Sequence, residues 1–596
     1  AGSELAGAIA GLAREAGVAD RLNQPAGLYV VAGATHDPAA RGALLAAARV
    51  ALNADAGLLA EQLEAADWNP ELPEPLTASP PVAAWRDEPV AAPEDLLLSN
   101  GLGGFTPDGR EYVVLIDSPP RGQAIPRPAL PPLPWSNVVA NPSAGFLVTE
   151  AGSQCTWAGN SQLNRLTSWS NDPVRDPSAE VVYLRDEEAG QVWSPTPLPI
   201  PGASPVLVRH GQGYTTFERN SHGLRQRLDV FMDPDRPIKF LRLRVENPGA
   251  ARRKLSATFY AEWVLGSTRD QSAMHVVTAI DPETGALTAR NSFREAFAEG
   301  VAFLDVDRRP RTVTGDRGEF LGRHGSIANP AALGQVELSG LVGSGLDPCG
   351  ASQTKFDLEP GEALEIVFLL GWADSPSQVR EAIGHVRDLG AAGALERTKA
   401  RWDDLLGVVQ VRTPEPSFDL PINRWLLYQT TSCRLWGRTA FYQSGGAFGF
   451  RDQLQDVLAL LHAAPELARK QILLHASRQF VEGDVQHWWH PPDGRGVRTR
   501  YSDDYLWLPF VASRYVETTG DSAALDESVP FLQAPALAAG QEDDYRLPDV
   551  SPDAAPLYEH CARALDRSNP RGGHGLPLIG GGDWNDGMNR VGVEGK

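Results

Sequence analysis

A glycine-rich segment near the end of the sequence carries two carboxylates beside an indole and an amide. It reads Gly580-Gly-Gly-Asp-Trp-Asn-Asp-Gly-Met-Asn-Arg590, so that Asp583, Trp584, Asn585 and Asp586 follow one another. Glycine lets a backbone approach a ligand closely, and burial beside a second carboxylate raises the pKa of a carboxyl group. A carboxyl group that keeps its proton near neutral pH is suited to general acid catalysis. The segment therefore predicts an acid that acts on a bound ligand, with a purely structural turn as the alternative.

The same segment partly matches a calcium-binding loop. Asp583, Asn585, Asn589 and Glu594 fall at positions 1, 3, 7 and 12 of such a loop. The sharp turn of that loop requires glycine at position 6, and this chain has Met588 there. We therefore expect no metal ion at this segment.

Aromatic and polar residues alternate in a second segment, from Gln486 to Trp507. The C–H face of a sugar ring packs well against an indole, while its hydroxyl groups bind charged or amide side chains. Trp488 and His490 are therefore expected to contact a carbohydrate. His487 and His490 lie three apart beside a double proline, without the glutamate of a His-Glu-x-x-His zinc site, so a metal site is not expected. An aromatic loop that packs without touching a ligand is the alternative.

A third segment, from Phe441 to Asp456, combines a glycine turn with the start of a helix. Arg451 offers a fork of donors, and the carboxylate of Asp452 can accept two sugar hydroxyl groups. A charged helix start with a local Arg–Asp pair is the alternative. A phosphate-binding loop is excluded because no Gly-Lys-Ser/Thr follows the glycines. The apolar face of this helix is expected to carry Leu454, Val457, Leu458 and Leu461.

The sequence around these segments has two textures. From about residue 95 to 375, short runs rich in β-branched and aromatic residues are bounded by Gly, Pro, Asn and Asp, which predicts a large antiparallel β-sandwich. After it, residues 377–406 follow a helical pattern with Val379, Ile383 and Val386 on one stripe. The clearest expected strands are Tyr112–Ile116, Gly145–Thr149, Val181–Leu184, Lys239–Val245 and Leu364–Leu370.

We therefore predict a multidomain α and β protein in four parts. Residues 1–90 form a small helical N-terminal region with a Pro-rich connector, in which residues 27–32 are expected to form a strand and leucines recur at helical spacing from 44 to 63. Residues 91–376 form the sandwich, and residues 377–415 form linker helices. Residues 416–596 form an all-α domain whose helices are joined by long loops rich in Gly, Trp and His.

Composition narrows the classes of partner and compartment. The formal net charge is −21, and an acidic surface repels both nucleic acid and anionic membranes. The four cysteines lie far apart and form no Cys-x-x-Cys pair, so a reducing compartment, the cytoplasm, is expected. No apolar run approaches the ~18 residues of a membrane helix.

The chain resembles the family 94 glycoside phosphorylases, which are also classed as glycosyltransferase 36-type enzymes. Within that family it looks like the C-terminal phosphorylase-like region of cyclic β-1,2-glucan synthases. The matching strings are long and specific. They are residues 100–112, 156–157, 168–174, 183–186, 209–214, Gly446-Ala-Phe-Gly-Phe-Arg-Asp-Gln-Leu-Gln-Asp456 and Gly581-Gly-Asp-Trp-Asn-Asp-Gly-Met-Asn589.

The resemblance implies a β-sandwich, a linker helix and an (α/α)6 barrel, which would be truncated here. It also implies that Asp586 donates a proton to the glycosidic oxygen, and that Trp584, Arg451 and Asp452 line the donor-sugar subsite. Inorganic phosphate would attack the anomeric carbon from the opposite face and give α-glucose 1-phosphate with inversion. Phosphate would then be the co-substrate, with no cofactor, and a homodimer is a further expectation.

Two departures from the family pattern limit what the resemblance implies. Cellobiose-type members have an Arg six residues before the position of Asp452, where this chain has Gly446, which favours a β-1,2-glucan substrate. The family's phosphate-binding residues follow the Asp-Trp-Asn-Asp string by a long distance. We therefore expect this stretch alone to be inactive and its parent, anchored in the bacterial inner membrane if it is a synthase, to be active.

Two other functions stay open at this point. An inverting hydrolase on the same fold would release free sugar without phosphate. A non-catalytic glucan-binding region of a synthase would bind the chain and leave it intact.

Overall fold

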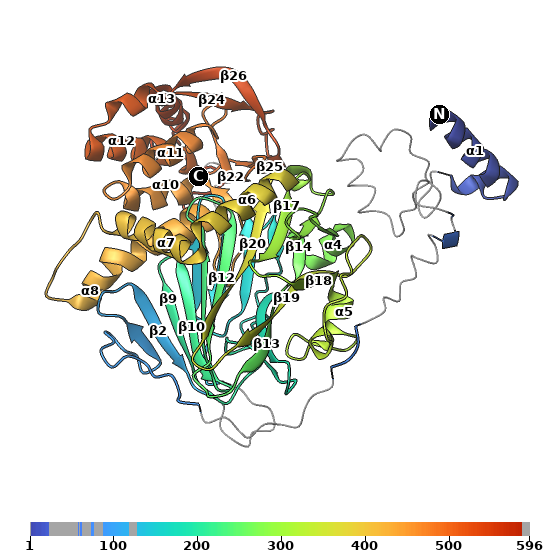
Figure 1. Ribbon diagram of the computed structural model, residues 1–596. Helices are drawn as coiled ribbons and strands as arrows, with labels where there is room; N and C mark the ends of the chain where they lie inside the picture. Colours follow the sequence, from blue (N-terminus) through green and yellow to red (C-terminus); the bar gives the residue numbers. More distant parts are fainter. Residues whose placement is uncertain are drawn as a thin grey trace.

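The computed structural model describes residues 2–22, 58, 60–61, 73–76, 87–118 and 128–586. Helix α1 (Gly2–Glu15) stands apart from the main body (Figure 1). The strand expected at residues 27–32 and nearly all of the leucine pattern from 44 to 63 lie outside the described residues.

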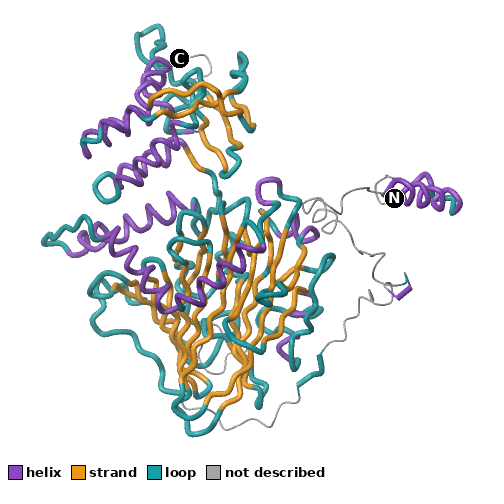
Figure 2. The backbone as a smooth tube through the Cα atoms, turned by 45° about the horizontal axis from the view of Figure 1, so that its top comes forward, coloured by secondary structure: helices purple, strands orange, loops and turns teal. Residues whose placement is uncertain are grey.

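A large antiparallel sandwich forms the body of the molecule (Figures 1 and 2). One sheet has ten strands in the order β1-β2-β9-β10-β11-β12-β20-β17-β16-β15. Their bounds are Gly103–Phe105, Glu111–Ile116, Val206–Gly211, Tyr214–Ser221, Leu224–Met232, Ile238–Glu246, Ala363–Ala373, Val301–Val306, Leu287–Arg290 and Val277–Ile280.

Two five-stranded sheets complete the sandwich. The first has the order β18-β19-β13-β7-β8, with bounds Arg311–Asp316, Pro348–Leu358, Arg253–Ala261, Glu180–Asp186 and Val192–Trp193. The second has the order β14-β6-β5-β4-β3, with bounds Trp263–Gly266, Arg165–Thr167, Gln154–Ala158, Ala144–Thr149 and Ser136–Ala140. All five strands singled out in the sequence are confirmed, as β2, β4, β7, β12 and β20.

The core of the sandwich lies between the sheets and is almost wholly aliphatic and aromatic. Phe217, Leu241 and Phe368 of the large sheet are fully buried against residues such as Leu255 and Phe259 of β13. One ion pair is buried with them, because Lys239 Nζ lies 2.5 Å from Glu180 Oε2 and both side chains have no exposed surface. A buried charge is tolerated only when it is paired, and this contact joins β12 of the large sheet to β7 of a five-stranded sheet.

Two linker helices lie across the large sheet (Figure 1). They are α6 (Pro376–Leu389) and α7 (Ala391–Leu406). Ser375 caps α6, since its side chain accepts a hydrogen bond from the Gln378 backbone. The predicted stripe of Val379, Ile383 and Val386 is buried against the sheet, so the helical period was assigned to the correct face.

A helical domain follows, and its part from residue 450 onward forms the upper lobe in Figure 1. A continuous helical stretch runs through α8 (Pro416–Leu420), a π-helical turn, α9 (Leu426–Gln429) and a second π-helical turn that ends at Gly437. The later helices are α10 (Phe450–Val457), α11 (Pro465–Ala476), α12 (Trp507–Thr519) and α13 (Leu557–Arg567). The expected apolar face of α10 packs into their common core, with Leu454, Val457 and Leu461 buried and Leu458 partly buried.

The expectation of an all-α domain was wrong in one respect. Strands β21 (Phe448–Gly449), β22 (Gln486–His490), β23 (Arg495–Thr499) and β25 (Asp543–Arg546) form a sheet, and β24 (Ser528–Gln533) pairs with β26 (Asp549–Pro556). The Trp/His-rich segment is therefore mostly a hairpin. Its aromatic and β-branched residues favour a pleated, half-buried surface, which helix periodicity does not reveal.

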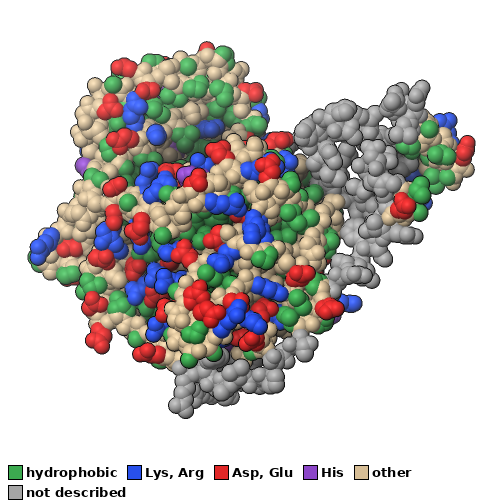
Figure 3. Space-filling model, viewed as in Figure 1, with side chains coloured by type: hydrophobic (Ala, Val, Ile, Leu, Met, Phe, Trp, Pro, Cys, Tyr) green, Lys and Arg blue, Asp and Glu red, His purple; other side chains and the backbone are tan. Residues whose placement is uncertain are grey.

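Acidic and basic side chains are intermingled over the sandwich on the face shown in Figure 3. Arg227 pairs with Glu218, and Arg242 pairs with Glu365, on neighbouring strands of the large sheet. Within the described part of the chain, no helix has the length and apolarity needed to cross a membrane.

Candidate active site

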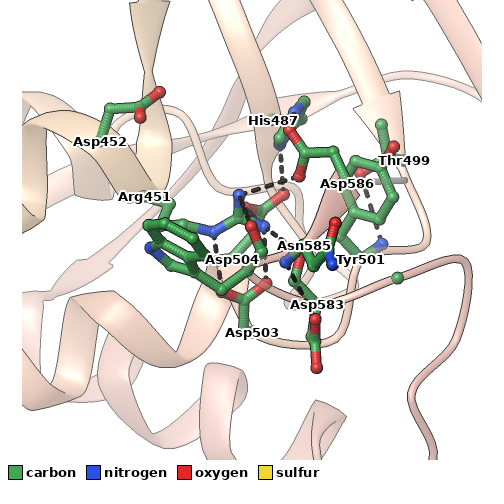
Figure 4. A network of polar contacts seen from close by, with 12 residues as sticks. Arg451, Asp452, His487, Thr499, Tyr501, Asp503, Asp504, Asp583, Asn585 and Asp586 are labelled. Atoms are coloured by element: carbon green, nitrogen blue, oxygen red, sulfur yellow. Dashed lines mark hydrogen bonds and ion pairs between the residues drawn. The ribbon is translucent and has the colours of Figure 1, made fainter. Parts of the chain in front are cut away.

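Three segments far apart in the sequence meet at one side chain, Arg451 (Figure 4). Arg451 sits in the first turn of α10, directly after the glycine turn. Asp503 and Asp504 begin the short 3-10 turn that leads into α12. The third segment is the glycine-rich loop that carries Asp583 and Asp586.

Arg451 is buried, and its guanidinium is bound on every side. Nε and Nη2 donate to the two oxygens of Asp503 at 2.7 and 2.8 Å. Nη1 donates to Asp586 Oδ1 at 2.9 Å, and Nη2 donates to the Asp583 carbonyl oxygen at 2.7 Å. Such forked, charge-assisted bonds have a fixed geometry. Arg451 therefore fixes the position of Asp586, the second carboxylate of the glycine-rich loop.

The glycine-rich loop lies directly against the end of β23. The Gly581 N–H donates to the Arg500 carbonyl at 3.0 Å, and the Ser502 N–H donates to the Gly582 carbonyl at 3.0 Å. A Cβ on Gly580, whose φ is +64°, would lie 2.2 Å from the Arg500 carbonyl oxygen. The sequence therefore needs glycine here because any side chain would push the loop away from the strand.

Asp586 presents one oxygen to Arg451 and leaves the other accessible. Its side chain is 54% exposed, and Oδ2 lies 3.8 Å from His487 Nε2. His487 Nδ1 in turn lies 2.8 Å from Oδ2 of Asp504, whose side chain is 2% exposed. More than half of the Asp586 side chain therefore remains open to contact from outside the protein.

The titration of this cluster is set by burial and by its excess of negative charge. Burial raises the pKa of Asp504, opposed by His487 and Arg451. Burial also works against a charged imidazole at His487, but the hydrogen bond that its Nδ1–H donates to Asp504 and the charges of Asp504 and Asp586 outweigh burial, so the pKa of His487 is raised. Both pKa values are raised, so the His487–Asp504 pair holds a proton more tightly than the two isolated side chains would.

The indole of Trp584 is the most exposed aromatic surface at the site. It is 65% exposed, and its Nε1 lies 3.3 Å from Gln455 Oε1 on α10, so the ring is anchored at one end. Asp583 accepts the Asn585 N–H through Oδ1 at 3.0 Å, which shapes the loop between them. Figure 4 shows the Asp583 carboxylate directed away from that of Asp586.

Three of the sequence-predicted residues lie outside this cluster. Asp452 is half-exposed and faces Arg438 at 3.6 Å and Arg434 at 4.0 Å, and Figure 4 shows it apart from Asp586. Trp488 is half-buried and packs against Tyr545 and His490, with ring centroids 5.6 Å apart in both cases. His490 is 8% exposed, and burial lowers its pKa.

The sandwich holds the glycine turn before α10. Asn160 donates from Nδ2 to the carbonyl oxygens of Gly446 and Pro491, both at 3.0 Å. Arg165 donates to the Ser444 carbonyl at 2.8 Å. Gly446 has a φ of +61°, and a Cβ there would lie 2.2 Å from Asn160 Oδ1. A side chain at position 446 is therefore excluded by both strain and contact.

Sequence reasoning missed His487, Asp503 and Asp504 as members of the site. His487 was considered only as a metal ligand, and the two aspartates were given no role. The available signal was the pair of adjacent carboxylates in the middle of an aromatic segment, Tyr501-Ser-Asp-Asp-Tyr505. Across the described residues, no group of three or more His, Cys, Asp or Glu side chains is arranged to hold a metal ion.

Comparison with known proteins gives consistent matches along the chain. Residues 122–389 match the glycosyl hydrolase 94 supersandwich domain, and residues 401–596 match the catalytic domain of the glycosyl hydrolase 94 superfamily. Cyclic beta-(1,2)-glucan synthase NdvB of Rhizobium meliloti is 44% identical over 84% of this chain and 18% of its own length. N,N'-diacetylchitobiose phosphorylase of Vibrio proteolyticus is 27% identical over 83% of this chain and 62% of its own.

The chain spans less than two thirds of the length of either relative. A bacterial glucoamylase complexed with acarbose is a remote structural neighbour, at 10% identity and a TM-score of 0.41 over 68% of this chain and 59% of the other. The two domain matches cover the sandwich and the helical domain in the order in which the structure has them, and the chain belongs to glycosyl hydrolase family 94.

Proposed function

We propose that the protein carries out inverting phosphorolysis of a β-glucan with β-1,2 linkages and releases α-glucose 1-phosphate. It would do so as part of a cyclic β-1,2-glucan synthase or as a 1,2-β-oligoglucan phosphorylase. The names of its relatives support both the linkage and the reaction class. In the proposed division, residues 416–596 carry the chemistry, and residues 377–415 link them to the sandwich of residues 91–376, which supports the site. Residues 1–90 form the N-terminal region.

Asp586 is the proposed general acid. The observation that carries this role is its two-sided environment, with Oδ1 fixed 2.9 Å from Arg451 and Oδ2 3.8 Å from His487 Nε2 on a side chain that is 54% exposed. The Oδ2–H bond breaks as the proton passes to the glycosidic oxygen, and the anomeric C–O bond breaks with it. A phosphate oxygen forms the new bond on the opposite face. No second carboxylate is needed as a base, because phosphate is already an anion.

The other site residues are proposed to bind and orient the sugar. Trp584 offers its exposed indole face to a glucosyl ring, and Arg451 and Asn585 hold the loop around it. Asp452, Asp583, Trp488 and His490 complete the proposed subsites. Inorganic phosphate is the co-substrate, with no cofactor.

The turn at Gly446 supports the proposed preference for β-1,2 over cellobiose-type linkage. Gly446 lies where cellobiose-type members have an arginine, and the contact with Asn160 leaves no room for a side chain there. A hollow of about 190 Å³ borders this turn, lined in part by Arg434, Arg438 and Gly446. We propose that this space accommodates the different direction of a β-1,2-linked chain.

The proposed location is the cytoplasm, with a parent protein that is anchored in the inner membrane if it is a synthase, and with a homodimer as the assembly. Free thiols at all four cysteines are consistent with a reducing compartment.

The test of the function is Asp586→Asn in the full-length protein, with Asp566→Asn on the exposed part of α13 as the control. α-Glucose 1-phosphate released from β-1,2-glucan and phosphate is measured together with glucan affinity. We expect turnover to fall by about 10²- to 10⁴-fold with affinity retained, because the amide keeps the shape of the acid but carries no acidic proton. Phosphate-independent release of free sugar would identify a hydrolase instead. Unchanged turnover in Asp586→Asn would refute the assignment.

A further inference from the structure

His487 lies between the proposed acid and a buried carboxylate. Its Nδ1 is 2.8 Å from Asp504 Oδ2, and its Nε2 is 3.8 Å from Asp586 Oδ2 (Figure 4). The side chain is 15% exposed, so the ring has little freedom to turn away. The three groups form a line from the protein interior to the exposed oxygen of Asp586.

A β-bulge aims the ring in this direction. In the pairing of β22 with β23, Gln486 lies opposite Arg498 and Trp488 lies opposite Val497. His487 is therefore the extra residue of the bulge. A bulge redirects a side chain out of the regular alternation of a strand, and such irregularities gather next to active sites. The ring of Tyr501 packs edge-on against it, with centroids 4.7 Å apart.

The charges around the ring favour a proton on it. Asp503, Asp504 and Asp586 all lie within 3.4 Å of the one guanidinium of Arg451, so three negative charges meet one positive charge. The groups that face His487 from the packed elements are Asp504, Asp586, Arg451 and the Tyr501 ring. Arg451 is the one cation among them, and its charge opposes protonation. The carboxylates outweigh it, and the pKa of His487 is raised.

We propose that His487 is a positioning residue that acts through Asp586 and holds on its own Nε2 the proton that Asp586 delivers. This rests on the proposed function of Asp586. The N–H of Nε2 breaks as the proton moves to Oδ2 of Asp586, and the new O–H breaks as the proton moves to the glycosidic oxygen. Neutral His487 then regains a proton from solvent, which has taken up the proton that hydrogen phosphate lost. The 3.8 Å separation closes in the substrate complex, as catalytic hydrogen bonds commonly do.

Asp504 has a separate part in this arrangement. It accepts from Nδ1 and is 2% exposed, so it fixes the tautomer with Nε2 facing Asp586 and stabilises the imidazolium. Arg451 holds the other oxygen of Asp586, which leaves Oδ2 for the proton. The proton thus has one route, from His487 Nε2 to Asp586 Oδ2 and from there to the glycosidic oxygen.

The activity test compares His487→Gln with His462→Gln, a histidine exposed on the same domain. In the full-length protein, kcat is measured against pH, with glucose 1-phosphate and free sugar both quantified. We expect His487→Gln to lower kcat on the order of 10²-fold with KM unchanged, and to remove the fall in kcat that is expected of the parent as pH rises through the raised pKa of His487. A parental pH profile in His487→Gln would overturn the proposal.

A second measurement does not depend on turnover. The His487 ring is titrated by NMR with labelled histidine, and its signal is assigned by its loss in His487→Gln. Neutralising Asp586 in Asp586→Asn is expected to lower the pKa of the ring, because one of the two carboxylates that raise it has gone. An unchanged titration in Asp586→Asn would show that the two groups do not share a proton. If the parent releases no sugar, the proposed function is wrong. The titration would still show whether His487 and Asp586 are coupled.

Discussion

Neutralising Asp503 tests whether Arg451 supports the proposed acid, Asp586. Asp503→Asn replaces a carboxylate that accepts two guanidinium bonds, at 2.7 and 2.8 Å, by an amide that accepts one. A hydrogen bond that involves a charged group contributes about 1.5–3 kcal/mol, and the bond that remains still has the charged Arg451 as its donor, so losing one of the two bonds costs about 1.5–3 kcal/mol. It stays below the 3–5 kcal/mol of an orphaned buried charge, since Asp504 and Asp586 still compensate Arg451.

The assay follows both stability and turnover. Urea unfolding is monitored by tryptophan fluorescence, and glucose 1-phosphate release is measured on the same preparation. We expect a lower unfolding midpoint and a fall in kcat of about tenfold, because the guanidinium that loses its fork also holds Asp586. Glu517→Gln is the matched control, since it breaks an exposed pair with Arg514 on α12 and is expected to change neither quantity. If Asp503→Asn behaves like Glu517→Gln, Arg451 does not support the acid.

Three further predictions concern binding, core stability and pH. Trp584→Ala is expected to weaken glucan binding about tenfold in calorimetry through lost stacking, and an unchanged affinity would exclude the indole from the subsite. Glu180→Gln is expected to destabilise the sandwich by about 3–5 kcal/mol in denaturant titrations, because it leaves the Lys239 charge buried without its partner. Burial lowers the pKa of His210 to about 4, so its contribution to stability is complete above pH 6.5 and is lost as pH falls toward 4. That loss amounts to about 3 kcal/mol, and His210→Gln should flatten the pH dependence of the unfolding free energy.

The sandwich and linker helices were predictable because their signals are local. Period-two runs such as Lys239–Val245 and the stripe of Val379, Ile383 and Val386 follow directly from which face of an element is buried. The hairpin at Gln486–Thr499 was not predictable in this way. Its aromatic residues suit a sheet as well as a loop, and its partner β25 lies more than forty residues further along the chain.

The candidate site was only partly accessible for the same reason. Trp584 and Asp586 stand out as unusual types in a glycine-rich string, and Arg451 stands out beside a turn. The convergence of Arg451 with Asp503 depends on how α10 and α12 pack, which no spacing along the chain encodes. The direction of His487 depends on a bulge of one residue in β22, which the sequence does not reveal.

The hold of Asn160 and Arg165 on the turn before α10 has a consequence for assembly. Backbone carbonyls of Ser444, Gly446 and Pro491 find their donors on a separate domain that precedes them in the chain. During synthesis the sandwich emerges first, and domains generally fold as units in that order. The turn before Arg451 thus adopts its conformation against a sandwich that has already folded. A helical domain produced without the sandwich would lack these donors, so the turn before α10 would not be held in this conformation.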